Sequence, residues 1–201
     1  MTPPQDAPPY HDDLDATLAE AWRLLREGVD DAGSAFHTPA VATVTADGLP
    51  AVRTVILRGA DPAARVLRFY TDGRAAKVAE IAARPRIVLH VYQPGPEIQL
   101  RLDCLATVHG HDAPADAAWQ AVPQGGRDNY RADPAPATPI PDPHAAGLLP
   151  ADENPDAGRA FFRVVEAQVL ALEWLLLAKA GQRRARFSWP EGRLEGTWLV
   201  P

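Results

Sequence analysis

The sequence predicts a mainly β protein, built as an antiparallel barrel or sandwich with a few flanking helices. Short apolar or alternating segments recur along the chain, and turn sequences such as Asp47-Gly48 and Pro94-Gly95 separate them. No strand–helix–strand unit repeats. The 201 residues suffice for one domain with a substantial core. We therefore expect a mobile leader over residues 1–13, followed by a single domain over residues 14–201.

The amino-terminal part of that domain begins with a helix. Apolar residues recur there at spacings of three and four, which is the period of an amphipathic helix: Leu14, Leu18, Trp22, Leu25 and Val29. Asp12 or Asp13 is available as its N-cap, and Gly33 lies near its expected end.

The next segments have the composition of β-strands. Residues 41–46 and 51–57 flank Asp47-Gly48, which predicts a hairpin. Residues 66–71 and 87–92 suggest a second strand pair. A short helix over residues 74–83 should separate these two strands and end before Pro85, because the residue before a proline is pushed out of the helical region.

The carboxyl half continues the β pattern. Residues 98–104 alternate between apolar and polar side chains, so we expect a strand with one buried face. A helix is expected over residues 113–122. Residues 161–178 mix helix and strand formers, and we assign their first part to a strand. Residues 183–189 and 194–200 should form a closing hairpin.

Residues 124–157 are dense in Pro, Gly, Ala and Asp. A segment of that length without regular structure is either functional or mobile in a compact domain. We expect a loop that covers a site or a partner subunit.

Composition narrows the class of protein. Twenty Lys and Arg residues against 26 Asp and Glu residues give a net charge of -6, which disfavours a general nucleic-acid-binding surface. The single cysteine, Cys104, excludes an internal disulfide and indicates a reducing compartment. Neither a secretory signal nor an apolar run of about 20 residues is present, so we expect a soluble cytoplasmic protein with no membrane contact.

The residues that suggest chemistry are cationic or carry a hydroxyl group, and they fall within one segment: Arg53, Arg58, Tyr70, Thr71, Arg74 and Lys77. A phosphate monoester carries close to two negative charges, so it needs several charge-assisted donors. A lysine in the first turns of a helix adds one more donor, and the helix amino terminus itself adds a favourable dipole. Because the sequence has no glycine-rich phosphate loop, side chains would have to make any nucleotide site.

The same pattern also fits a solvated face of a sheet. Arg53 and Arg58 are five residues apart, so an unbroken strand would aim them to opposite sides. Either a bulge or a strand end re-aims one of them, or the two serve different parts of a ligand.

Other reactive residues favour structural roles. His109 and His111 would share a strand face, and we interpret them as an exposed pair and not as a metal site. Cys104 falls on the apolar face of its strand and is predicted to lie in the core. Trp22 is predicted to be a packing anchor, and Trp198 is a candidate for a dimer core.

Taken in order, these residues resemble the pyridoxamine 5'-phosphate oxidase-like FMN-binding split-barrel family. The resemblance runs from about Ala40 to the carboxyl terminus. It rests on the ordered set of Arg53-Thr54-Val55-Ile56-Leu57-Arg58, Phe69-Tyr70-Thr71 leading to Lys77, Glu80 with Arg84-Pro85-Arg86, Gln99, and Trp174 with Arg186-Phe187 and a terminal Trp-Leu-Val-Pro. It implies an FMN-binding split β-barrel that forms a homodimer, with two FMN sites at the subunit interface.

The resemblance also implies a cofactor-binding set: Arg53, Thr54, Val55, Ile56, Arg58, Tyr70, Thr71, Arg74, Lys77, Gln99, Trp174 and Arg186. The first members, Arg53 with Tyr70, Thr71 and Lys77, would hold the phosphate and the neighbouring parts of FMN. The last three would lie along the flavin ring or its ribityl edge. No catalytic residue is identified, since the chemistry would reside in the cofactor.

The chain departs from the family pattern where a phosphorylated substrate would bind. The family has a Tyr, Arg and Ser set after the strand that holds Gln99, and residues 119–131 offer no convincing equivalents. Gln182-Arg183-Arg184 stands where an Arg-x-His pair is expected, and Ala76 stands where the family has an arginine that Arg74 could replace.

Three functions remain open. The favoured one is an FMN-dependent oxidoreductase acting on an unidentified small-molecule substrate. The alternatives are an authentic pyridoxine/pyridoxamine 5'-phosphate oxidase and a non-catalytic module that binds or senses flavin.

Overall fold

The computed structural model describes residues 8–150, 156–179 and 181–201. Its strands are β1 (Ala40–Val44), β2 (Pro50–Thr54), β3 (Leu57–Asp61), β4 (Val66–Asp72), β5 (Arg86–Gln93), β6 (Ile98–His109), β7 (Ala132–Asp133), β8 (Gly147–Leu148), β9 (Phe162–Leu176), β10 (Arg183–Ser188) and β11 (Glu195–Leu199). Its α-helices are α1 (Leu14–Asp30), α2 (Ala76–Ala83), α3 (Ala113–Ala121) and α4 (Gln124–Arg127). Turns of 3-10 helix are η1 (Pro9–His11), η2 (Ala35–His37), η3 (Asp128–Tyr130) and η4 (Pro190–Gly192).

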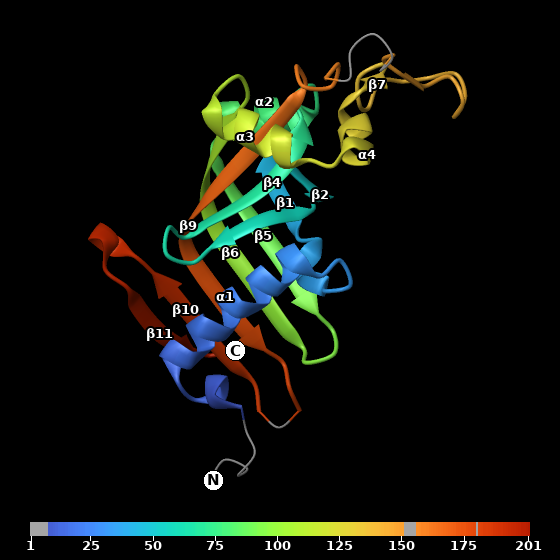
Figure 1. Cartoon of the computed structure of the whole chain (residues 1–201). Coiled ribbons are helices and arrows are strands. Elements are labelled where there is room, and N and C mark those ends of the chain that lie inside the picture. Colours follow the sequence, from blue (N-terminus) through green and yellow to red (C-terminus); the bar gives the residue numbers. More distant parts are fainter. Residues whose placement is uncertain (1–7, 151–155, 180) are drawn as a thin grey trace.

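Nine strands form one antiparallel sheet around two long central strands, β6 and β9. The order is β11-β10-β9-β6-β5-β1-β2, and β4 joins the sheet by pairing with both β3 and β9. Figure 1 shows α2 and α3 at one end of the long strands and the β10–β11 hairpin toward the other. This architecture confirms the predicted fold class, a mainly antiparallel β protein with flanking helices.

Helix α1 lies across the strands and covers the main core (Figure 1). The Asp13 carboxylate caps it by accepting a hydrogen bond from the Ala16 backbone N–H at 2.7 Å. Trp22 is buried on its apolar face, as predicted, and Cys104 is fully buried on β6, also as predicted. Burial raises the pKa of the Cys104 thiol to about 12, so this thiol stays protonated at neutral pH.

A second, smaller core lies under α3. It consists of Ala115, Trp119, Phe162 and Val164, with Tyr70, Ala118, Val122 and Tyr130 packed against it. This cluster attaches the segment after β6 to the start of β9.

Two predictions about the strands are wrong, one about the extent of a strand and one about strand pairing. The expected strand over residues 51–57 is divided, because β2 ends at Thr54 and β3 begins at Leu57. The Val55 backbone N–H donates to the carbonyl of Pro39 at 3.0 Å where the chain crosses from the partner β1 to the partner β4. Residues 66–71 and 87–92 do not pair with each other: β4 pairs with β3 and β9, whereas β5 pairs with β1 and β6.

The segment over residues 161–178 contains one strand, β9, that continues through the half left unassigned. Leu, Ala and Glu favour helix there, but β6, β4 and β10 supply backbone partners along its length, and this tertiary pairing outweighs the local propensity.

The expected loop over residues 124–157 contains α4, η3 and the short β7–β8 pair, and its residues 151–155 lie outside the described residues. The predicted leader also falls partly outside them. Its described part forms η1, where Tyr10 packs against Trp174 with ring centroids 5.5 Å apart.

The interpretation of the histidines also needs correction. Strand β6 ends at His109, so His111 does not share its strand face. His109 contacts carboxylates, with Nδ1 2.8 Å from Asp112 and Nε2 3.5 Å from Glu166.

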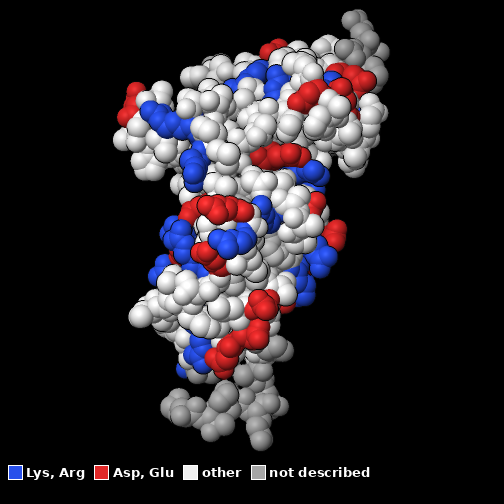
Figure 2. All heavy atoms as spheres, turned by 90° about the vertical axis from the view of Figure 1, so that its left-hand side faces the viewer, with Lys and Arg blue, Asp and Glu red and all other residues white. Residues whose placement is uncertain are grey.

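Charged side chains of both signs lie next to one another on the face shown in Figure 2. Ion pairs of this kind include Arg68 with Glu166 at 2.7 Å and Arg184 with Glu173 at 2.7 Å. Among the described residues, no helix has the length and apolar character needed to cross a bilayer.

Candidate functional site

Two cations and a hydroxyl group meet where the first turn of α2 lies beside the end of β4. Lys77 donates from Nζ to Oγ1 of the buried Thr71 at 3.0 Å. Arg53 reaches the same helix from β2, where its Nη2 lies 2.9 Å from Oε2 of Glu80. Lys77 and Glu80 are three residues apart, so they share one face of α2.

A hydrogen-bonded network fixes the position of Arg53. Its Nη1 donates to the hydroxyl of Thr43 on β1 and to the carbonyl of Ala51, the latter at 3.4 Å. Thr43 in turn donates to Oε2 of Glu80 at 2.5 Å. The hydrogen bond from Thr43, followed by that from Arg53, lowers the pKa of the Glu80 carboxyl, which is therefore ionised at neutral pH.

The electrostatics of this cluster fit a phosphate group. Burial and then the positive charge of Arg53 lower the pKa of Lys77, so two cations are held close enough to oppose each other's charge. Lys77 makes no ion pair with any residue in the described ranges. A phosphate monoester would bring close to two negative charges to the pair and relieve this repulsion. The donor set is therefore suited to the phosphate end of a mononucleotide.

Arg58 points to a different place from Arg53. It is the extra residue of a β-bulge, because the register between β3 and β4 shifts between Leu57 and Gly59. Its side chain lines a cavity of about 370 Å³ whose other walls come from β4, α3, α4 and η3: Tyr70, Ala121, Val122, Pro123, Gly126, Asn129 and Tyr130. We call this the Arg58 cavity.

The Arg58 cavity and the cation cluster share one end of the fold. Asp72 acts electrostatically on both Lys77 and Tyr130. Tyr70 and Thr71 are consecutive on β4, so their side chains leave the strand on opposite sides, the first toward the cavity and the second toward Lys77.

Arg74 is not part of the cation cluster. Its Nε and Nη2 donate to the Asp72 carboxylate at 3.0 and 2.7 Å, and its guanidinium stacks over Phe161 at 3.8 Å from the ring centroid. The three residues between Arg53 and Leu57 vary in exposure: Thr54 and Ile56 are exposed, and Val55 is buried.

Gln99, Trp174 and Arg186 lie at the other end of the sheet. Thr71 is in register with Arg163 on β9, and Leu100 is in register with Trp174 on the same strand. Those two positions of β9 are eleven residues apart, which corresponds to about 36 Å of strand. One flavin mononucleotide is too short to reach both groups within one chain.

These three residues also differ in their surroundings. Gln99 is half-buried, and the exposed Arg186 has its Nη1 3.5 Å from Glu173 on β9. Trp174 is 0% exposed and packs on Tyr10, so its ring belongs to the core of this chain.

Sequence reasoning missed Thr43, which holds Arg53, and Tyr130, which lines the Arg58 cavity. It named Glu80 within the ordered set of the resemblance but assigned it no role in holding Arg53. The spacing of Lys77 and Glu80 on a predicted helix is a signal that both would face the same strands. For Thr43 and Tyr130, nothing in the sequence indicates their proximity to the site.

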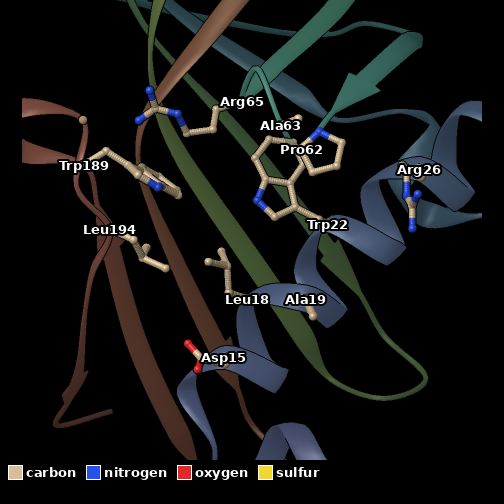
Figure 3. A pocket seen from close by; sticks show the side chains of 11 residues that line it. Asp15, Leu18, Ala19, Trp22, Arg26, Pro62, Ala63, Arg65, Trp189 and Leu194 are labelled. Carbon is tan, nitrogen blue, oxygen red and sulfur yellow. The ribbon is translucent and has the colours of Figure 1, made fainter.

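A groove of about 600 Å³, larger than the Arg58 cavity, lies elsewhere, between α1, the β3–β4 connection and the β10–β11 hairpin. Figure 3 shows Trp22 and Leu18 from α1 facing Trp189 and Leu194, with Arg65 beside them. None of the twelve predicted cofactor-binding residues lines it.

Comparison with known proteins assigns this domain. Residues 19–110 match the family described as pyridoxamine 5'-phosphate oxidase, FMN-binding domain. This part of the chain is therefore similar to the pyridoxamine 5'-phosphate oxidase-like family. FMN is accordingly the cofactor of this domain, and the matched range contains Arg53, Thr71 and Lys77.

Curated relatives of this pyridoxamine 5'-phosphate oxidase-like domain match part of the chain. A pyridoxine/pyridoxamine 5'-phosphate oxidase of Pseudomonas paraeruginosa is 32% identical over 116 residues, which cover 54% of this chain and 52% of that protein. One of Anaeromyxobacter dehalogenans is 38% identical over 88 residues, covering 44% and 43%. The chain spans about half the length of the curated relatives it matches.

Solved structures share the fold over the whole chain. A pyridoxamine 5'-phosphate oxidase-related FMN-binding protein from Nostoc punctiforme has a TM-score of 0.76 at 22% identity, covering 98% of this chain and 100% of that one. PhzG from Burkholderia lata, solved with tetrahydrophenazine-1-carboxylic acid, has a TM-score of 0.68 at 18% identity and covers 100% of both chains. These likenesses confirm the split-barrel fold.

Proposed function

We propose that this protein is an FMN-dependent oxidoreductase in which Arg53, Thr71 and Lys77 bind the phosphate of the cofactor. The observation that carries the proposal is the pairing of a half-buried ammonium with a nearby guanidinium and a buried hydroxyl. Each contact to a charged phosphate contributes about 1.5–3 kcal/mol. The first turn of α2 adds a favourable dipole at the same place.

The protein residues position FMN and neutralise the charge of its phosphate. FMN, when bound, supplies the ability to accept a hydride. Glu80 and Thr43 hold the guanidinium of Arg53 toward α2. Thr71 holds the ammonium of Lys77 in place. Tyr70 and Arg58 line the adjoining cavity, which is where a small-molecule substrate would lie.

The complete site is formed by two copies of the chain. Gln99 and Arg186 lie about 36 Å of strand away from the phosphate cluster, so they can border the same flavin only from a second subunit. The working unit is therefore a homodimer with FMN at the interface. In this assembly Trp174 supports the far end of β9 from inside the core.

The curated relatives favour a second candidate, an authentic pyridoxine/pyridoxamine 5'-phosphate oxidase, because both reported above carry that name. Supplying pyridoxine 5'-phosphate or pyridoxamine 5'-phosphate with oxygen tests it. Formation of pyridoxal 5'-phosphate would establish this activity, and absence of the product would remove it.

The principal test is to purify the protein, record its flavin absorbance and identify the released cofactor by mass spectrometry. Nicotinamide and amine donors are then added without oxygen, and bleaching of the flavin is followed. We expect bound FMN that at least one donor reduces. A protein without FMN contradicts the proposed site, and bound FMN that no donor reduces indicates a binding or sensing module.

A further inference from the structure

We propose that the Arg58 cavity binds a substrate with a single negative charge, a planar organic carboxylate, and disfavours a phosphate ester. This inference rests on the proposed function, because the cavity adjoins the proposed FMN phosphate site. It goes further by naming the substrate class and the residue that recognises it.

The first observation is that Arg58 is available. Its side chain is exposed into the cavity mouth, and it has no hydrogen bond or ion pair with any residue that the structure describes. The β-bulge at Arg58 removes it from the regular pairing of β3 with β4 and turns its side chain out of that alternation. Among the described residues of this chain, Arg58 is therefore the one cation that lines the cavity, and it is ready to meet an anionic ligand.

The second observation is that the neighbouring arginines are already used. Arg127 donates to the carbonyls of Val122 and Trp119, each at 3.2 Å, pairs with Asp156 at 3.0 Å and stacks over Trp119. The buried Arg131 donates to the carbonyl of Leu149 and pairs with Asp128 at 2.5 Å. Moving either one to a ligand would leave part-buried carbonyls without their donor, which is unfavourable.

The third observation concerns the remaining charge. Arg74, two residues beyond the end of β4, is held by the buried Asp72. The negative charge of Asp72 is therefore already balanced, and Asp72 does not line the cavity. A dianionic phosphate beside Arg58 would keep one uncompensated negative charge, whereas a carboxylate would be neutralised by the guanidinium.

The walls of the cavity suit a flat apolar body. Ala121, Val122 and Pro123 form one side. Tyr70 and Tyr130 both pack against Phe162, with ring centroids 5.0 and 4.9 Å away, so their rings are fixed. Burial raises the pKa of Tyr130 to about 12, so its hydroxyl remains a hydrogen-bond donor at neutral pH. Together with Asn129 it can orient a polar group of the ligand.

The test uses the FMN-loaded protein and three probes with the same ring: 2-naphthoate, 2-naphthyl phosphate and the neutral 2-naphthamide. Binding is measured at pH 7.5 by calorimetry and by the perturbation of the flavin spectrum. FMN content is measured first for every variant. Loss of FMN affects the proposed function, whereas loss of naphthoate binding to an FMN-loaded protein affects only this inference.

We expect 2-naphthoate to bind at least tenfold more tightly than either other probe. Arg58→Gln should reduce naphthoate affinity tenfold or more while leaving naphthamide affinity unchanged. Arg26→Gln, a change at an exposed arginine of α1, should alter neither. Val122→Arg adds a second cation to the cavity wall, so it should raise naphthyl phosphate affinity at least tenfold.

Three results would overturn the proposal. The first is naphthyl phosphate binding to the unmodified protein as tightly as naphthoate. The second is naphthoate affinity that does not change in Arg58→Gln. The third is no binding of naphthoate to the FMN-loaded protein.

Discussion

Lys77 and Thr71 join the first turn of α2 to the end of β4 through one hydrogen bond of 3.0 Å between Nζ and Oγ1. The bond holds an ammonium group beside a second cation, Arg53, although burial and like charge both disfavour its charged form. An arrangement that is unfavourable in the empty cluster becomes favourable when an anion binds.

FMN affinity should depend on pH through Lys77. The pKa of Lys77 lies below its ordinary value of 10.5, and a bound phosphate would raise it. Above the lowered pKa, binding must take up a proton, so affinity should fall as pH rises toward 10.5. Below about pH 6 the phosphate itself gains a proton, and affinity should fall again.

Lys77→Arg is the control for this pH profile, because a guanidinium stays charged throughout this range. The decrease on the alkaline side should disappear in that variant, while any titration of the flavin itself remains common to both proteins. Fluorescence titrations with FMN from pH 5 to 10.5 measure it. Identical alkaline limbs in both proteins would contradict the role of Lys77.

Glu80 should stabilise the fold in a pH-dependent way. Its pKa is lowered from 4.5 in the folded protein, so its contribution is present above pH 4.5 and is lost as pH falls through the folded value. Glu80→Gln should lower the free energy of unfolding at pH 7 by about 1–3 kcal/mol. It should also weaken FMN binding several-fold, because Arg53 loses its partner.

Urea unfolding between pH 3.5 and 7 checks the Glu80 prediction. The difference between Glu80→Gln and the unmodified protein should narrow below pH 4.5, and a constant difference would count against it. Glu27→Gln is the matched control: Glu27 pairs with Arg23 on the exposed side of α1, and such pairs contribute at most about 1 kcal/mol.

Gly28→Ala should destabilise the protein, although alanine normally favours a helix by about 1 kcal/mol over glycine. A Cβ at Gly28 would lie 2.4 Å from the Phe36 backbone, so α1 or η2 would have to shift, at a cost of about 1–3 kcal/mol. At Gly125 a Cβ meets nothing within 4 Å, so Gly125→Ala should be neutral or mildly stabilising. Thermal unfolding measures both, and a higher melting temperature for Gly28→Ala would show the contact to be wrong.

Mixed dimers should reveal whether two chains build each site. Lys77→Ala removes a contact to the FMN phosphate, and Gln99→Ala removes a contact along the flavin. Each homodimer should therefore bind FMN weakly at both sites. A heterodimer of the two variants would contain one intact site and one doubly altered site. Co-expression with different affinity tags isolates it, and we expect one tightly bound FMN per heterodimer. No tight site in the heterodimer would mean that both residues act within one chain.

The sequence predicted the cation cluster because its members are close along the chain and their elements follow one another. Arg53, Thr71 and Lys77 lie on β2, β4 and α2, where the turn and helix signals are clear. The residues that hold this cluster in place, Thr43 and Glu80, could not be predicted in the same way. Thr43 reaches Glu80 only after β1 and β2 pair and α2 packs against β1.

Other residues in the expected site have partners that sequence position does not reveal. Arg74 is held by Asp72 and Phe161, and Trp174 is covered by Tyr10 from the opposite end of the chain. The two alternatives for Arg53 and Arg58 could also be separated only in three dimensions. The strand ends after Thr54, a bulge then turns Arg58 outward, and the two arginines line different parts of one end of the fold.

The most direct measurement compares the affinities of FMN and riboflavin for the unmodified protein and for Lys77→Ala, Arg53→Ala and Arg26→Ala. These two ligands differ only in the phosphate. We predict that Lys77→Ala and Arg53→Ala each weaken FMN binding by about tenfold or more and leave riboflavin binding unchanged. Arg26→Ala should change neither affinity. Equal losses for FMN and riboflavin, or no loss of FMN affinity, would contradict the assignment of these residues to the phosphate.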